Sequence, residues 1–408
     1  INTLDLSLYS TTIDITIVSA GSLKGMAGTI ATILPNGFDN IDSLKAGSAI
    51  NDSLDMTALA ALSITLTGSK AGGEVTLGAF SGIEILNVTS GSDLTGTANT
   101  DTFTTSGVDS GTVQDIAYYG FSSLDGAGGD DVFNIGHTIT GLAGGGAGDD
   151  TFNMTALVST AGIEGGTTGE VLGDTLDLTL LGDLSITLIG SNSGTEVTLG
   201  TFIDIDILNG TAGSTLNGTV GDDSFTLTGA GTGNVRGIDY SGYDTIAGGT
   251  GTDTLTGLNT GQAWTITAYN AGNDGTYYFS SIENLTGGSV VDSFTIADTF
   301  GLSGTIDGGG DTYTLSYASY SGAVSIDLEA GTATNMGGIS NLETFIGGGA
   351  SDTLIGLNAG QTWSITVNDA GNDGTYYFTG IENLTGGTLA DSFAFANGVG
   401  LTGTLDGG

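Results

Sequence analysis

The sequence of 408 residues contains four Lys plus Arg residues against 45 Asp plus Glu residues, a formal net charge of −41 at pH 7. Because phosphate groups are bound by clustered Lys and Arg, this charge excludes nucleic acid as a partner and argues against anionic lipid headgroups. The absence of Cys excludes disulfides and thiolate metal sites, and an apolar fraction of 38% is too high for a disordered chain.

The strands that the sequence predicts are short and alternate in polarity. In chain order, the clearest segments are 5–8, 62–66, 264–267 and 363–366, in which Thr, Ile, Leu or Trp recurs at every second position. A period of two with β-branched and aromatic residues indicates β-strands, and no segment of useful length has the period of a helix. The sequence therefore predicts an all-β protein.

A sequence motif that recurs about every forty residues predicts the architecture. It contains apolar residues three apart, a glycine pair, an aspartate and a further apolar residue; its cleanest copy is Phe279, Ile282, Leu285, Gly287, Gly288, Asp292 and Phe294. Other copies begin at Phe38, Phe80, Phe121, Phe202, Tyr240 and Phe378. A fixed period of this size is typical of stacked arrays. We expect a parallel β-helix (β-solenoid) of roughly 20 coils, in which like residues lie over like.

Two longer duplications are superimposed on this motif. Residues 54–107 align with 176–229 at an offset of 122, and residues 255–308 align with 354–407 at an offset of 99. No Pro-rich or Ser-rich linker separates the copies. We therefore expect residues 1–408 to form one continuous solenoid, with a possible sub-boundary near 230–250, where the first duplicated family gives way to the second.

Short hairpins are expected to project from the stack. The tracts 270–277 and 368–376 contain Asn-Asp-Gly, a strong signal for a tight turn. Trp264 and Trp363 are expected to pack beneath them. An alternative is that these tryptophans form a stacking platform for carbohydrate together with Tyr277 and Tyr376.

Several turns resemble the glycine-rich nonapeptide of RTX (haemolysin-type) repeats, Gly-Gly-x-Gly-x-Asp-x-U-x, in which U is apolar. Segments 145–152 and 248–255 match in full, 126–133 and 347–354 match in part, and 287–292 keeps only the first glycines and the acid. In that family, calcium lies between loops on successive turns and is held by the Asp carboxylate and backbone carbonyls. The resemblance implies a calcium-binding β-helix of a giant bacterial surface protein.

The resemblance also implies which residues hold calcium. Family members carry the nonapeptide in direct tandem, whereas single copies here lie 19 residues or more apart. Two pairs of acids with that spacing are expected to lie one coil apart. The first-ranked site consists of Asp130, Asp131, Asp149 and Asp150, and the further candidates are Asp253, Asp292 and Asp311. The alternative is that these aspartates only cap turns.

An enzymatic interpretation rests on a single fragment. Gly129-Asp130-Asp131 followed by Gly136-His137 resembles elements of polygalacturonases, right-handed β-helix enzymes in which paired carboxylates flank a glycosidic bond. The His follows the acids by only six residues, and no nearby Lys or Arg is present to hold an acidic sugar. The sequence therefore favours a protein that is not an enzyme and has no catalytic residues.

The functional expectation is a structural one. The chain is similar to segments of giant secreted repeat proteins, which implies an extracellular or bacterial cell-surface location and self-assembly, end to end or lateral, into a filament, fibre or surface layer. A ligand-binding adhesin that recognises a glycan or a cell surface ranks second, and a polysaccharide-active enzyme third. The sequence shows no secretion signal and no membrane-inserting segment, and we interpret it as a piece of a longer protein.

Overall fold

A computed structural model of the chain describes residues 1–408. It contains 44 β-strands, β1 to β44, and no helix. The strands divide between two compact units: unit 1 comprises residues 1–184 and 190–211, and unit 2 comprises residues 185–189 and 212–408. The single continuous solenoid and the sub-boundary near 230–250 stay predictions.

Unit 1 contains twenty complete strands. They are β1 (Thr3–Asp5), β2 (Asp14–Ala20), β3 (Met26–Ile30), β4 (Leu34–Ile41), β5 (Ser43–Lys45), β6 (Ser53–Asp55), β7 (Ser63–Gly68), β8 (Ala71–Glu74), β9 (Gly78–Ser81), β10 (Ile85–Thr95), β11 (Thr102–Gly107), β12 (Ser110–Val113), β13 (Ile116–Asp125), β14 (Val132–Ile135), β15 (Ile139–Ala147), β16 (Thr151–Met154), β17 (Thr160–Thr168), β18 (Thr175–Asp177), β20 (Ser193–Glu196) and β21 (Gly200–Ile203). The strands β19 (Ser185–Gly190) and β22 (Ile207–Asn217) contain residues of both units.

Unit 2 contains the remaining strands. They are β23 (Ser224–Gly229), β24 (Thr232–Val235), β25 (Ile238–Ala247), β26 (Thr254–Thr256), β27 (Ala263–Ala268), β28 (Ala271–Asn273), β29 (Tyr278–Ser280), β30 (Asn284–Thr286), β31 (Ser293–Ile296), β32 (Leu302–Asp307), β33 (Thr314–Ser316), β34 (Ser325–Asp327), β35 (Thr332–Ala333), β36 (Met336–Ser340), β37 (Thr344–Ile346), β38 (Thr353–Ile355), β39 (Thr362–Val367), β40 (Ala370–Asn372), β41 (Tyr377–Thr379), β42 (Asn383–Thr385), β43 (Ser392–Phe395) and β44 (Leu405–Asp406).

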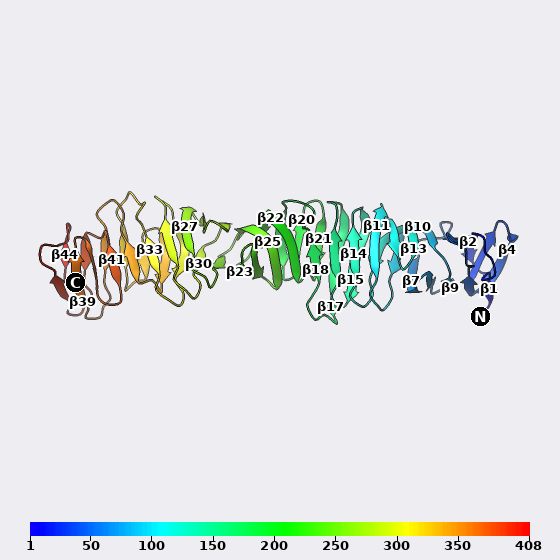
Figure 1. The fold of residues 1–408 in the computed structure, drawn as a ribbon, viewed down its shortest axis with the longest axis horizontal. Coiled ribbons are helices and arrows are strands. Elements are labelled where there is room, and N and C mark those ends of the chain that lie inside the picture. Colours follow the sequence, from blue (N-terminus) through cyan, green and yellow to red (C-terminus); the bar gives the residue numbers. More distant parts are fainter. The chain divides into compact units, whose positions relative to one another are not determined.

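Parallel pairing stacks successive coils in unit 1 (Figure 1). The strands β11, β14, β16, β18 and β22 pair in that order, and their central residues form one column of Phe103, Phe133, Phe152, Leu176 and Leu208. All five side chains are buried. The ring centroids of Phe103 and Phe133 lie 4.8 Å apart, and those of Phe133 and Phe152 lie 4.9 Å apart, close to the spacing of paired strands. A second column contains Ile64, Leu94, Leu124, Ala143, Ile163 and Phe202.

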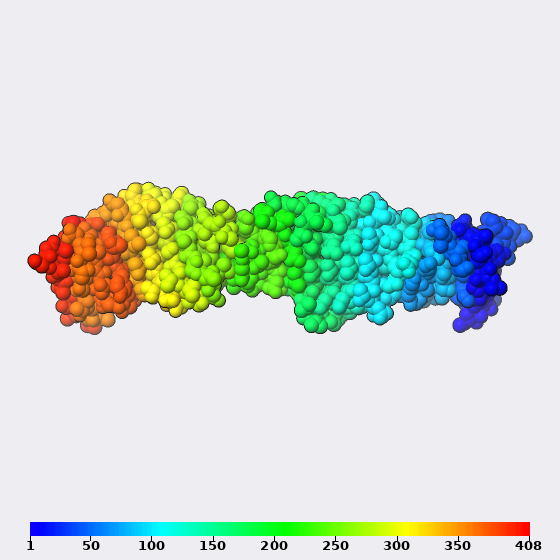
Figure 2. Space-filling view, in the orientation of Figure 1, coloured from blue at the N-terminus to red at the C-terminus, as the bar shows by residue number.

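Unit 2 is built in the same way. One of its columns contains Trp264, Phe294, Leu315, Phe345 and Phe378, and another contains Ile326, Leu354, Leu384 and Leu405. Within each unit the sequence colours follow one another in bands without interleaving (Figure 2), so that coils close in sequence are neighbours in space. The prediction of an all-β parallel solenoid with apolar residues stacked in columns is confirmed.

The coils differ in length because some carry an antiparallel arm. Phe103 pairs with a residue 30 positions later, whereas the next step of the column, from Phe133 to Phe152, is 19 positions. The longer coil includes β12, which pairs antiparallel with both β11 and β13. The strands β27, β28 and β29 form such an arm at the first predicted hairpin, and β39, β40 and β41 form one at the second.

The two tryptophans pack beneath these arms. Trp264 and Trp363 are buried and meet Phe279 and Phe378 edge to face, at centroid distances of 5.8 and 5.9 Å. Tyr277 is buried as well, and its hydroxyl donates to the carbonyl oxygen of Gly229. These three rings therefore belong to the core, where they present no platform for a sugar.

Candidate functional site

Buried aspartates form the most regular polar feature of the molecule. Each lies directly before a strand whose second residue enters an apolar column, and no member is more than 3% exposed. The set, here called the carboxylate ladder, is Asp52, Asp101, Asp131, Asp150, Asp174, Asp223, Asp253, Asp292 and Asp352. A carboxylate is costly to bury, so each member needs a structural reason.

For seven of the nine members that reason is a backbone N–H group on the preceding coil, which donates to Oδ1, whereas the Oδ1 atoms of Asp101 and Asp223 accept from a side chain. The N–H of Asp101 donates to Asp131 Oδ1 (2.6 Å), that of Asp131 donates to Asp150 Oδ1 (2.7 Å), and that of Asp150 donates to Asp174 Oδ1 (2.7 Å). In unit 2 the N–H of Asp223 donates to Asp253 Oδ1 (2.7 Å). The donating N–H group belongs to the residue directly before a strand and is buried. Without the carboxylate of the adjacent coil this N–H group would have no hydrogen-bond acceptor.

In four ladder members the second carboxylate oxygen closes the turn that precedes the aspartate. In unit 1 the N–H of Thr97 donates to Asp101 Oδ2 (2.5 Å), and in unit 2 the N–H of Gly288 donates to Asp292 Oδ2 (2.7 Å). Related bonds reach the second oxygen of Asp223, Asp352 and Asp391. Asp292 and Asp352, whose Oδ1 atoms also accept the N–H groups of Gln262 and Val324, thus tie their own turns to the preceding coil.

The glycine five residues before the aspartate makes room for the second carboxylate oxygen. A Cβ atom at Gly126 would lie 2.1 Å from Asp131 Oδ2 and 2.3 Å from the carbonyl oxygen of Gly145 on the next coil. Gly248 is related to Asp253 in the same way. The recurrent glycine is therefore required by close approach at this position.

Some ladder oxygens have no hydrogen-bond partner. They are the Oδ2 atoms of Asp52, Asp131, Asp150, Asp174 and Asp253. Burial raises the pKa of Asp131 to about 8, that of Asp150 to about 6 and that of Asp174 to about 7, and neighbouring carboxylates act in the same direction. Asp131 therefore retains its proton at neutral pH, because burial disfavours its charged form and the charges of neighbouring carboxylates add to this effect.

Every Lys and Arg of the chain is paired with a carboxylate. Lys24 Nζ lies 3.1 Å from Asp42 Oδ1, Lys45 Nζ lies 3.5 Å from Asp5 Oδ2 and Lys70 Nζ lies 2.9 Å from Glu84 Oε1. The fourth cation is Arg236. The folded chain thus places each cation beside an acid.

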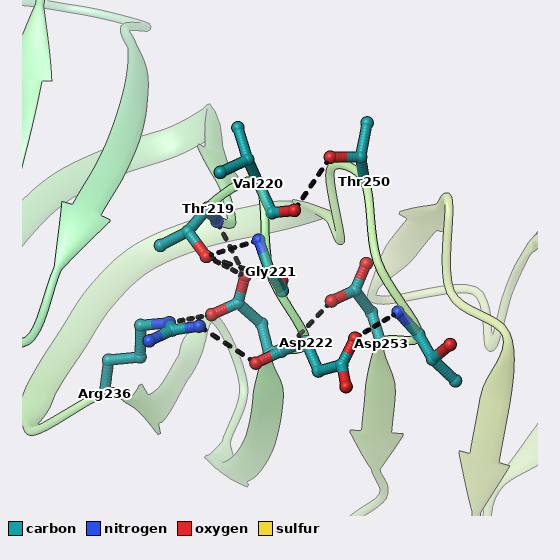
Figure 3. A network of polar contacts seen from close by, with 9 residues as sticks. Thr219, Val220, Gly221, Asp222, Arg236, Thr250 and Asp253 are labelled. Atoms are coloured by element: carbon teal, nitrogen blue, oxygen red, sulfur yellow. Dashed lines mark hydrogen bonds and ion pairs between the residues drawn. The ribbon is translucent and has the colours of Figure 1, made fainter.

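Arg236 anchors a polar network at the start of unit 2 (Figure 3). Its Nε donates to the ladder residue Asp223, and its Nη2 donates to the carbonyl oxygen of Asp222 (2.9 Å). On the next coil, the hydroxyl of Thr250 donates to the carbonyl oxygen of Val220 (3.0 Å). In unit 1 the equivalent of Arg236 is Gln114, whose Nε2 donates to Asp101.

The four acids of the first-ranked calcium site divide into two kinds. Asp131 and Asp150 lie on successive coils, as expected, but they are buried members of the ladder. Asp130 is exposed and Asp149 is half-buried, and Asp130 Oδ1 accepts the N–H of Asp149 (3.0 Å). The carboxylate of Asp149 accepts the N–H groups of residues 171–173. Calcium at this corner stays a prediction.

The other candidates do not form one site. Asp253 and Asp292 are buried ladder residues. Asp311 is exposed, and its Oδ1 accepts the N–H of its neighbour Thr312 (2.8 Å). The register of β31 and β33 places Tyr313, and not Asp311, over Asp292.

A different acidic cluster brings three carboxylates together. Oxygen atoms of Glu170, Asp174 and Asp206 all lie within 4.8 Å of one another. Glu170 lies in the loop between β17 and β18, and Asp206 lies directly before β22. Our sequence analysis did not single out Glu170 or Asp206, because neither belongs to the nonapeptide pattern. The duplication with an offset of 122 is the signal that could have revealed this cluster, because it shows that the second copy has an acid, Glu170, where the first copy has Ser48.

The fragment that resembles polygalacturonases has a structural role. Asp131 is buried and its Oδ1 accepts a backbone N–H, while Asp130 and His137 are exposed. The two acids therefore do not face a common cleft in which they would flank a glycosidic bond.

Comparison of the chain with protein-family models, with curated proteins and with solved structures gives no match. No helix of the structure has the length and apolar character needed to span a bilayer. The functional argument therefore rests on the geometry of the coils and of their acids.

Proposed function

We propose that this chain is a structural segment of an extracellular bacterial surface protein, a stiff β-solenoid that assembles into a filament, fibre or surface layer. The supporting observation is the combination of stacked columns and the carboxylate ladder. In both units, each coil is joined to the next by strand pairing, by apolar stacking and by a carboxylate that accepts a backbone N–H. All three interactions resist separation of the coils.

A structural role also accounts for the acids better than catalysis does. The ladder aspartates are buried and bonded to backbone groups, so they present no reactive oxygen to a substrate. Kinship with RTX-type repeat proteins remains part of this proposal, and the turns at 145–152 and 248–255 support it.

Assembly would join coil edges that no further coil of the same chain covers. An edge strand carries unpaired N–H and C=O groups, and these can bind a strand of a second copy. Such head-to-tail contact does not close on itself, and it therefore produces a fibre.

Electron microscopy of the purified chain tests this proposal. We expect filaments or layers. Monodisperse particles at all concentrations tested would refute self-assembly.

A glycan-binding adhesin is the second candidate, and a groove in unit 1 favours it. The groove has a volume of about 1020 Å³ and is lined mainly by polar side chains, among them Thr102, Thr104 and Gln114. Tyr119 lies at its wall and is 47% exposed, as expected of a ring on which a sugar stacks. Binding of neutral glycans that is lost in Tyr119→Ala, without filaments in the microscope, would favour the adhesin over the scaffold.

A further inference from the structure

Two copies of one acidic cluster differ in their charge balance. The duplication with an offset of 122 extends to the residues just before its clearest part. It aligns Ser48 with Glu170, Asp52 with Asp174, Lys70 with Asn192, and Glu84 with Asp206. The first copy thus serves as an internal reference for the second.

In the first copy, the chain supplies its own cation. The N–H of Asp52 donates to Glu84 Oε2 (2.9 Å), and Lys70 Nζ lies 2.9 Å from Glu84 Oε1. Two carboxylates and one ammonium group give this cluster a formal charge of −1 when all three are ionised.

In the second copy, the backbone arrangement is kept but the cation is lost. The N–H of Asp174 donates to Asp206 Oδ2 (3.0 Å), which matches the contact between Asp52 and Glu84. Asn192 replaces the lysine, and its Nδ2 donates to Asp206 Oδ1. Glu170 adds a third carboxylate, so the formal charge is −3. All four Lys and Arg residues of the chain pair with other acids.

Two oxygen atoms of this cluster are buried and have no partner. Asp174 is 0% exposed, and its Oδ2 has no hydrogen bond. Glu170 Oε1 is likewise buried and unpartnered. Unpaired carboxylate oxygens beside a further carboxylate destabilise the fold unless a positive charge compensates them.

We propose that Glu170, Asp174 and Asp206 bind a calcium ion, which takes the place that the Lys70 ammonium group has in the first copy. The donor set consists of oxygen alone, as hard divalent cations prefer. This inference does not depend on whether the chain assembles, since it concerns the interior of unit 1.

The spacing of the oxygens is compatible with Ca²⁺. Oxygens on opposite sides of Ca²⁺ lie about 4.6 to 5.2 Å apart, because each Ca–O distance is about 2.3 to 2.6 Å, and the oxygens of the cluster all lie within 4.8 Å of one another. We choose Ca²⁺ over Mg²⁺ because Ca²⁺ accepts irregular coordination, whereas Mg²⁺ requires near-ideal octahedral geometry. A backbone oxygen is also near: a Cβ at Gly165 would lie 1.9 Å from the carbonyl oxygen of Asp204 and 2.3 Å from Asp174 Oδ2.

The ion would tie an exposed loop to the following coil. Glu170 is in the loop 169–174, and its neighbours Val171 and Leu172 are 86% and 78% exposed. Asp206 lies on the next coil, before β22. A cation shared by Glu170 and Asp206 therefore links two coils at a point where the loop side chains make few other contacts.

Isothermal titration calorimetry on the full chain, stripped of metal with a chelator, tests the proposal. We expect Ca²⁺ to bind and to raise the melting temperature. Glu170→Ser, which restores the residue of the first copy, should weaken this binding at least about ten-fold. Asn192→Lys should abolish it, because the added ammonium group restores the metal-independent arrangement. Both substitutions copy residues that the fold already accepts at the equivalent position, so both variants should fold.

Two further variants complete the design. The double substitution Ser48→Glu with Lys70→Asn should create a second Ca²⁺ site in the first copy. Asp239→Asn, at an exposed acid of unit 2, should leave binding unchanged. The proposal is overturned if millimolar Ca²⁺ gives no heat, or if Asn192→Lys binds Ca²⁺ as the unaltered chain does. Mg²⁺ that binds as tightly as Ca²⁺ would overturn the choice of ion.

Discussion

Substitution of Asp131 by Asn should remove a pH dependence of stability that this one residue causes. The side chain of Asp131 is buried, its Oδ1 accepts the N–H of Asp101, and its Oδ2 lies against Gly126 without a partner. Burial raises its pKa to about 8, with the charges of Asp150 and Asp101 adding to the effect. In the unfolded chain an aspartate has a pKa of about 3.9.

The sign of the effect follows from these two pKa values. Between pH 5 and pH 8 the folded chain retains a proton at Asp131 that the unfolded chain has released. The free energy of unfolding therefore falls as the pH rises through this window, by about 1.4 kcal/mol per pH unit at most. The contribution of Asp131 amounts to a loss on the order of 3 kcal/mol between pH 5 and pH 8.

Asparagine tests this reasoning because it has nearly the same shape. Its Oδ1 can still accept the N–H of Asp101, and its Nδ2 lies where the carboxyl proton would be, near the carbonyl oxygen of Gly145. The difference in unfolding free energy between Asp131→Asn and the unaltered chain should thus change by about 3 kcal/mol from pH 5 to pH 8, in favour of the variant.

The measurement is urea unfolding at several pH values in the presence of a chelator, followed by far-ultraviolet circular dichroism. Tryptophan fluorescence is unsuitable, since Trp264 and Trp363 both lie in unit 2. Hydrogen exchange of residues 97–135 locates the effect. Asp149→Asn is the control: backbone N–H groups of residues 171–173 lower the pKa of Asp149, so its contribution is constant above pH 5. Equal pH dependence in Asp131→Asn and the unaltered chain would refute the assignment.

Three further substitutions, each compared with a milder one, test the apolar packing, the close approach at glycine and the Arg236 contact. Phe133→Ala should cost about 3 to 5 kcal/mol in urea unfolding, because it opens a cavity between stacked rings, whereas Phe133→Leu should cost less than half of that. Gly126→Ala should cost at least about 2 kcal/mol, since its Cβ would meet two oxygens, while Gly128→Ala, with its nearest neighbour at 3.7 Å, should be nearly neutral. Arg236→Ala should lower the free energy of unfolding by about 2 kcal/mol. Arg236→Gln should lower it less, because Gln114 makes the equivalent contact in unit 1. Similar losses in both variants would contradict this account.

The fold could be predicted from the sequence because the repeat places like residues over one another. The apolar residues after each aspartate, such as Phe133 and Phe152, recur in a strand context, and stacking them buries one continuous core. Two of the arms could be predicted as well, since Asn-Asp-Gly at 273–275 and at 372–374 specifies a tight turn on local grounds alone.

The burial of the aspartates could not be predicted in the same way. A carboxylate beside glycines is usually exposed, so the turns were interpreted as solvent-facing corners that offer ligands. The structure buries Asp131 and Asp150 because a backbone N–H of the neighbouring coil compensates each carboxylate, and that partner is visible only once the coils are in register. One signal in the sequence could have indicated this burial. Glycine precedes aspartate by five residues both at Gly126 and Asp131 and at Gly248 and Asp253, and an aspartate that only caps a turn does not require a glycine at that distance.

The ladder also explains how so acidic a chain can stack its coils. Carboxylates one coil apart repel one another, and the fold limits this repulsion in two observable ways: Asp131 retains a proton because its pKa is raised, and Asp223 has a cation, Arg236, beside it. At Glu170 and Asp174 one oxygen of each carboxylate has no hydrogen bond and no Lys or Arg is paired with them, so that a proton or an external ion has to compensate the charge. A solenoid that grows by duplication can therefore exchange a lysine for a metal site by changing two side chains, without altering the backbone of the coil.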